Sequence, residues 1–80
     1  MTRLSYDAVG DAFAIVLRDL PSVETLEIAK GVLLDLGEDG DPVGLEFLSL
    51  AHVAPFMAAH GGRYELPTRS NSTTKPRGTA

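Results

Sequence analysis

An 80-residue chain without cysteine forms one domain at most, and it can carry neither a disulfide nor a thiolate metal site. It holds no apolar run long enough to cross a membrane and starts without a signal peptide, so we expect a cytoplasmic protein. Residues 1–62 carry three basic and ten acidic side chains, whereas residues 63–80 carry four basic and one acidic. The acidic body argues against nucleic-acid binding by the domain itself.

The first half of the chain predicts β-strands, because apolar and polar residues alternate with period two. We expect strands at residues 3–6, 12–17, 23–28, 32–36 and 43–48. Turn residues separate them, which favours a succession of hairpins. The predicted fold class is therefore α+β, with an antiparallel meander of about five short strands whose first and last members form the two edges.

A short helix is expected to follow the strands and to pack on one face of the sheet. Ser49 has the chemistry of an N-cap, and Gly61 that of the residue just past a helix C-terminus. Pro55 cannot donate a backbone hydrogen bond inside a helix. We therefore expect a Pro-interrupted helix, with a turn at 49–53 and a second piece that begins at Pro55.

The predicted domain spans residues 1–62 and is followed by a basic tail, residues 63–80. From Pro67 onward only Ala80 is apolar, so this end of the chain is expected to be disordered. Four basic side chains in the tail leave a DNA-contacting regulator open as an alternative function. Loss of DNA affinity on removal of the tail would identify that case.

The segment from residue 35 to residue 46 permits two interpretations. As a calcium loop, it offers Asp35, Asp39, Gly40 and Glu46 at suitable positions, but Gly37 supplies no ligand and both flanks are β-type sequence. As a hairpin, it places Asp39 and Gly40 at the centre of a type I′ turn. We favour the hairpin and predict no metal site.

The hairpin interpretation also predicts a register. On one face it pairs Leu36 with Val43, Leu34 with Leu45 and Val32 with Phe47; on the other it pairs Asp35 with Gly44 and Leu33 with Glu46. Every apolar pair then falls in register, which a chance match rarely gives. Asp35 and Glu46 should lie diagonally on one face.

Two carboxylate pairs are candidates for acid–base chemistry, namely Asp35 with Glu46 and Asp7 with Asp11. A solvated acidic face explains the first pair more simply, and turn hydrogen bonds to the backbone explain the second. A deep pocket beside either pair would favour a small enzyme. Because no complete catalytic constellation assembles, we do not predict an enzyme.

The two histidines, His52 and His60, do not suggest a metal centre. They are separated by eight positions, and no cysteine or nearby carboxylate completes a ligand set. No nucleotide-binding glycine motif is present either. No cofactor is therefore predicted.

The leading prediction is an interaction module. Phe13, Ile15 and Leu17 should face the core, which leaves a second face that is more apolar than a solvated sheet should be. This candidate interaction face consists of Ala12, Ala14, Val16 and Leu33. We expect a homodimer or a protein partner, with the first strand as the better edge for strand addition.

An ordered set of residues resembles the DUF2283 family of small bacterial proteins over about residues 3–50. The set comprises Tyr6-Asp7, Asp11-Ala12 with the apolar run after it, Gly31-Val32, and Asp35, Asp39-Gly40 and Val43-Gly44-Leu45-Glu46. The sequence departs from the family pattern at Gly37, where an acidic residue is usual, and at Ala14, where tyrosine is frequent. The resemblance implies a compact domain of strands with a small helix and no established activity. It also hints at an antitoxin-like or accessory role.

Overall fold

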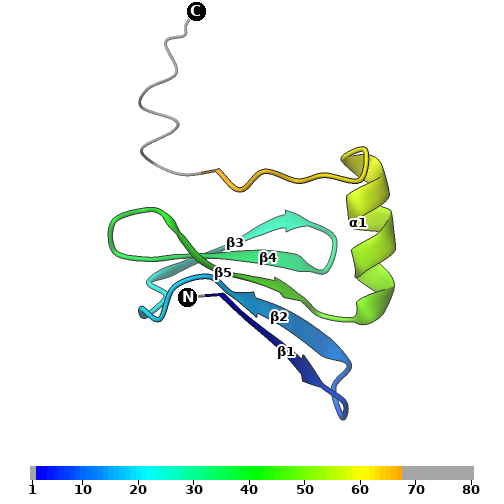
Figure 1. Cartoon of the computed structure of the whole chain (residues 1–80), viewed down its shortest axis with the longest axis horizontal. Helices are drawn as coiled ribbons and strands as arrows, with labels where there is room; N and C mark the ends of the chain where they lie inside the picture. Colours follow the sequence, from blue (N-terminus) through cyan, green and yellow to red (C-terminus); the bar gives the residue numbers. More distant parts are fainter. Residues whose placement is uncertain (1, 68–80) are drawn as a thin grey trace, which may run out of the picture.

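The computed structural model describes residues 2–67, which form an antiparallel sheet of five strands, one 3-10 turn and one α-helix (Figure 1). The strands are β1 (Arg3–Asp7), β2 (Ala12–Val16), β3 (Glu24–Ala29), β4 (Val32–Leu36) and β5 (Pro42–Phe47). The turn η1 covers Leu50–His52, and the helix α1 covers Val53–Ala59. The predicted fold class is confirmed. The prediction of disorder for residues 68–80 lies outside the described residues.

The strands lie in the order β1-β2-β5-β4-β3, so the sheet joins a hairpin to a three-stranded meander. Its edges are therefore β1 and β3, and the expectation that the last strand forms an edge is wrong. β5 is buried at every position except Glu46, which is half-buried. A strand with this much apolar surface gains most from a neighbour on both sides, and β2 and β4 supply them.

The predicted register of the β4–β5 hairpin is confirmed at four of its pairs: Val32 with Phe47, Leu33 with Glu46, Leu34 with Leu45, and Asp35 with Gly44. Beyond Asp35 the register shifts, and Leu36 faces Pro42 rather than Val43. The predicted type I′ turn is wrong, because it would need positive φ at both central residues. Only Gly40 has it, with φ 84°.

The turn instead closes one residue earlier. The N–H of Gly40 donates to the carbonyl of Gly37 at 2.9 Å, and the N–H of Gly37 donates to the carbonyl of Asp41 at 2.9 Å. A four-residue turn followed by a glycine in the left-handed region brings an extra residue into one strand. This bulge explains the shift at Leu36.

The core lies on one face of the sheet, beneath α1. It consists of Val32, Leu34, Leu45, Phe47 and Phe56. The Phe56 ring meets the Phe47 ring edge-on, with centroids 5.6 Å apart, and so joins the helix to the middle of the sheet. Each fully buried side chain of this size contributes about 1.5–3 kcal/mol. So small a core leaves much of the sheet partly exposed.

The caps of the helical segment are as predicted, but its start is not. Ser49 Oγ accepts from the N–H of Ala51 at 3.1 Å. α1 begins at Val53 rather than Pro55, directly after η1. Pro55 thus occupies the third helical position, where the absent N–H has no acceptor within the helix anyway. Gly61 has φ 68° and ends the helix.

The chain after α1 returns along the sheet, as Figure 1 shows. Tyr64 and Leu66 pack against the core cluster, and the Tyr64 ring lies 4.9 Å from the Phe56 ring between centroids. The packed part of the chain thus extends past residue 62, the predicted end of the domain.

Candidate functional site

The candidate interaction face and one of the candidate carboxylate pairs occupy the same surface. Glu46 of β5 faces Ala14 on one side and Leu33 on the other. In the next row of the sheet, Gly44 lies between Val16 and Asp35. We call this surface, which lies opposite the core, the second face.

Gly44 leaves room at the centre of the second face. A Cβ atom there would lie 3.3 Å from the carbonyl oxygen of Ile15 and 3.4 Å from Asp35 Oδ2. With no side chain at this position, a hollow of about 280 Å³ lies over the strands and reaches the Asp35 and Glu46 carboxyl groups. Arg3, Arg18 and Ser22 contribute to its walls.

The two carboxyl groups differ in their surroundings. Asp35 Oδ1 accepts a hydrogen bond of 2.7 Å from the Thr25 hydroxyl on β3. A hydrogen bond to Asp35, partial burial and the nearby Asp35 charge raise the pKa of Glu46 to about 7. A carboxyl group with this pKa can both give and take a proton near neutral pH. The hollow around it is open and shallow rather than deep.

Asp7 and Asp11 accept hydrogen bonds from different parts of the chain. Asp7 Oδ1 accepts from the N–H of Val9 at 3.0 Å, which is the predicted turn hydrogen bond. Asp11 instead accepts from the Tyr6 hydroxyl, from Ser49 Oγ and from the N–H of Leu50. Asp11 thus links the β1–β2 turn to η1.

Asp39, predicted as a turn residue, is held by an arginine. Arg18 donates from Nη1 and Nη2 to the two Asp39 carboxylate oxygens, each at 2.9 Å. It also donates from Nε to the carbonyl of Pro42 at 3.1 Å and from Nη2 to that of Asp41 at 3.0 Å. The guanidinium holds the pKa of Asp39 well below its usual range. Arg18 therefore fixes the β4–β5 loop against the end of β2.

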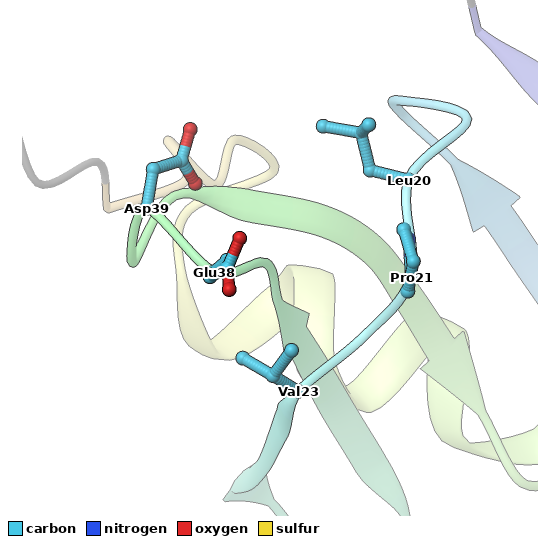
Figure 2. Close-up of a pocket in the computed structure, with 5 residues that line it drawn as sticks. All are labelled: Leu20, Pro21, Val23, Glu38 and Asp39. Carbon is cyan, nitrogen blue, oxygen red and sulfur yellow. The ribbon is translucent and has the colours of Figure 1, made fainter.

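Beside this ion pair lies a second hollow, of about 310 Å³ (Figure 2). Leu20, Pro21 and Val23 of the β2–β3 connection form one wall, and Glu38 and Asp39 of the β4–β5 loop form the other. Leu20 and Val23 are exposed, at 54% and 62%. Because Asp39 is already bonded to Arg18, this hollow offers an apolar wall and one further carboxylate, Glu38.

The histidines serve the packing of the helix. His60 Nδ1 donates a hydrogen bond to the carbonyl oxygen of Phe56 at 2.8 Å. The His60 ring also packs against the Tyr64 ring. His52 lies on Gly31, whose missing side chain makes room for its ring. Within residues 2–67, no group of three or more potential ligand side chains could hold a metal ion.

β1 is an open edge of the sheet, as expected for the first strand. Every residue of β1 is exposed, and Leu4 and Tyr6 remain 64% and 49% exposed. They face Ile15 and Phe13 of β2 and so extend the core side of the sheet beyond the area that α1 covers. Their alternation in the sequence signalled a strand, but not that its apolar side would stay uncovered.

These features define a small α+β domain with a five-stranded antiparallel sheet, a core under one helix and a shallow acidic hollow on the opposite face. The chain belongs to the DUF2283 family of proteins of unknown function, whose model matches residues 3–50. The match covers all the strands and ends at the start of η1. No curated protein and no solved structure matches the chain. Within residues 2–67, no helix is long and apolar enough to cross a membrane.

Proposed function

We propose that this protein is a small interaction module, of an antitoxin-like or accessory kind, that binds a protein partner by adding a strand to β1. The observation that carries the proposal is the exposure of β1 together with its two large apolar side chains, Leu4 and Tyr6. An edge strand presents backbone N–H and C=O groups that a second strand can pair. Alternate side chains then give such pairing its specificity.

The other edge is less suited to strand addition. β3 contains a register irregularity between Glu27 and Ala29, whereas β1 pairs with β2 without interruption. Bulges and charged side chains are the features by which proteins block edge strands. Both charged side chains of β3, Glu24 and Glu27, are acidic, whereas the two charged side chains of β1 are of opposite sign.

The experiment is capture of partners at native expression levels with the wild-type chain and two matched variants. Leu4→Lys places a charge on β1, and Val23→Lys places one at a similarly exposed apolar position, 62% against 64%, away from that edge. A partner retained by Val23→Lys and lost by Leu4→Lys supports the proposal. Equal capture by both variants, with both folded by circular dichroism, contradicts it.

A second candidate function is acid–base chemistry at Asp35 and Glu46, which two observations favour. A hollow lies directly over the pair, and the pKa of Glu46 is raised to about 7. Perturbed carboxyl groups in clefts are enriched at catalytic sites. A fragment screen by amide NMR tests this candidate: shifts at Asp35 and Glu46 that vanish in Gly44→Leu would support a ligand site there. Their absence across the screen would leave the carboxyl pair with a purely structural role.

A further inference from the structure

We infer that the partner at β1 is a second copy of this chain, docked β1 to β1 in antiparallel fashion with Ser5 on the two-fold axis. The inference rests on the proposed function and names its partner. The resulting dimer would join two five-stranded sheets into one continuous sheet. In Figure 1 no other described element lies beyond β1, so the approach to this edge is open.

The register follows from the residues of β1. With Ser5 opposite Ser5 of the second copy, Leu4 lies opposite Tyr6, and Arg3 lies opposite Asp7. All five residues of the strand are then paired, and the charges at its two ends meet charges of opposite sign. Opposite charges across a strand pair stabilise it, and like charges destabilise it.

The two-fold relation also keeps the apolar sides together. Residues directly opposite each other in an antiparallel pair point to the same face. Since Leu4 and Tyr6 both lie on the core side, facing Ile15 and Phe13 of β2, the pairing makes one apolar row that crosses the dimer axis. A register shifted by one residue would set Leu4 against Ser5 and break that row.

Backbone hydrogen bonding is compatible with this register whichever residues of β1 point their N–H and C=O groups outward. Along an edge strand, every second residue points its N–H and C=O groups outward. In β1 these are either residues 3, 5 and 7 or residues 4 and 6, and both sets are symmetric about Ser5. A second copy can therefore satisfy the outward groups of the strand without a bulge.

The Tyr6 ring is already held in position before any partner arrives. Its hydroxyl donates to Asp11 Oδ1, so the side chain loses little further rotamer freedom when it is covered. β3 does not offer the same pairing of opposite charges. Its charged residues, Glu24 and Glu27, are both acidic, so two copies would bring like charges together.

The size of the contact sets the expected strength. A strand of five residues buries less surface than a standard interface of about 800 Å² on each partner. We therefore expect a reversible dimer with a dissociation constant on the order of micromolar or weaker, rather than an obligate one.

Sedimentation equilibrium of the full-length chain, from about 1 µM to about 1 mM, tests the inference. We expect a monomer–dimer equilibrium that Ser5→Lys shifts toward the monomer by about fivefold, because two lysines would face each other across the axis. Ser22→Lys makes the same charge change at an exposed position off the strand and should leave the equilibrium unchanged. A monomer throughout the range, or a dimer that resists Ser5→Lys, overturns the inference.

Oxidative cross-linking gives an independent measurement, because the chain has no cysteine of its own. Ser5→Cys should form a covalent dimer much faster than Ser22→Cys, since only the former residue lies opposite its own copy. Equal cross-linking rates contradict the predicted register. If the chain is monomeric while Leu4→Lys still abolishes capture of another protein, the homodimer is wrong and the interaction module stands. If neither self-association nor the capture of another protein depends on β1, both the homodimer and the interaction module are wrong.

Discussion

The Asp11 carboxylate accepts a hydrogen bond of 2.7 Å from Ser49 Oγ, which lies 38 residues away in the sequence. It also accepts from the Tyr6 hydroxyl and, at 3.2 Å, from the N–H of Leu50. Asp11 itself has φ 62°, a conformation that aspartate tolerates better than most residues. The hydrogen bonds from Tyr6 and then Ser49 lower the pKa of Asp11. One side chain thus joins β1, the β1–β2 turn and η1.

Asp11→Ala should lower the melting temperature by several degrees, since it removes three hydrogen bonds and strains the backbone. Asp11→Gly separates these two causes, because glycine adopts positive φ without strain. We expect Asp11→Gly to recover part of the loss but not all of it. Asp7→Ala, which removes one local turn bond, serves as the control. Thermal denaturation followed by circular dichroism is the measurement, and a wild-type melting temperature in Asp11→Gly would show that the hydrogen bonds do not stabilise the fold.

The raised pKa of Glu46 predicts a dependence of stability on pH. Its pKa in the folded state is about 7, above the ordinary value of 4.5. The folded protein therefore holds this proton more tightly than the unfolded chain, and the associated stability is present below about pH 4.5 and lost as the pH rises through about 7. Asp35 is the main cause, because it accepts the hydrogen bond of the protonated form.

Glu46→Gln should remove this dependence, because the amide donates to Asp35 at every pH. At pH above 7 we expect the variant to be more stable than the wild type, by roughly 1 kcal/mol or less after solvent screening. Melting temperatures of the two chains, compared at mildly acidic and mildly alkaline pH, give the difference directly. Glu24→Gln on the exposed end of β3 should leave the wild-type profile intact. Parallel profiles for wild type and Glu46→Gln would contradict the assignment.

Gly31→Ala should be strongly destabilising for two reasons. Gly31 has φ 71°, and an added Cβ would lie 2.4 Å from the His52 ring. Gly61→Ala is a matched control, since Gly61 has φ 68° but no atom within 4 Å of the added Cβ. The backbone strain common to both costs about 1–3 kcal/mol, and the excess in Gly31→Ala measures the contact with His52. A double variant with His52→Ala should recover that excess, and equal effects at the two glycines would show that the contact is unimportant.

Arg18→Lys should lower the melting temperature nearly as much as Arg18→Ala. The guanidinium donates hydrogen bonds to both Asp39 carboxylate oxygens and to two backbone carbonyls. A lysine ammonium cannot reproduce this planar arrangement of donors. Since the Arg18 and Asp39 side chains are 33% and 53% exposed, salt should weaken the contribution of the pair. Denaturation of the three chains at low and high salt tests both points. A lysine variant as stable as the wild type would mean that charge alone suffices.

Calcium should not bind specifically to residues 35–46. Arg18 engages both carboxylate oxygens of Asp39, while Asp35 and Glu46 lie on the second face in a hydrogen-bonded pair. None of these three carboxylates therefore lies in the arrangement that a calcium loop requires. Amide NMR spectra recorded during titration with millimolar calcium provide the measurement. Saturable shifts confined to Asp35, Asp39 and Glu46 would contradict the prediction.

Much of the local structure could be predicted from the sequence, because it depends on residues close together in the chain. Alternating apolar residues fixed the strands, and the pairing of Leu34 with Leu45 and of Val32 with Phe47 followed from keeping one face apolar. Ser49 and Gly61 were recognisable as caps for the same reason, since the capping bond of Ser49 to Ala51 and the positive φ of Gly61 are both local to the helical segment. The diagonal placement of Asp35 and Glu46 also followed from the register alone.

Only the tertiary structure decided the features that depend on distant residues. β5 lies between β2 and β4 because the burial of its apolar side chains on both sides outweighs the shorter connections of a simple meander. Arg18 and Asp39 are 21 residues apart, so no local pattern signalled their ion pair or the turn that it accompanies. The contacts of Asp11 span almost half the chain. The exposure of β1, on which the proposed function depends, likewise follows from where the other strands settled rather than from its own five residues.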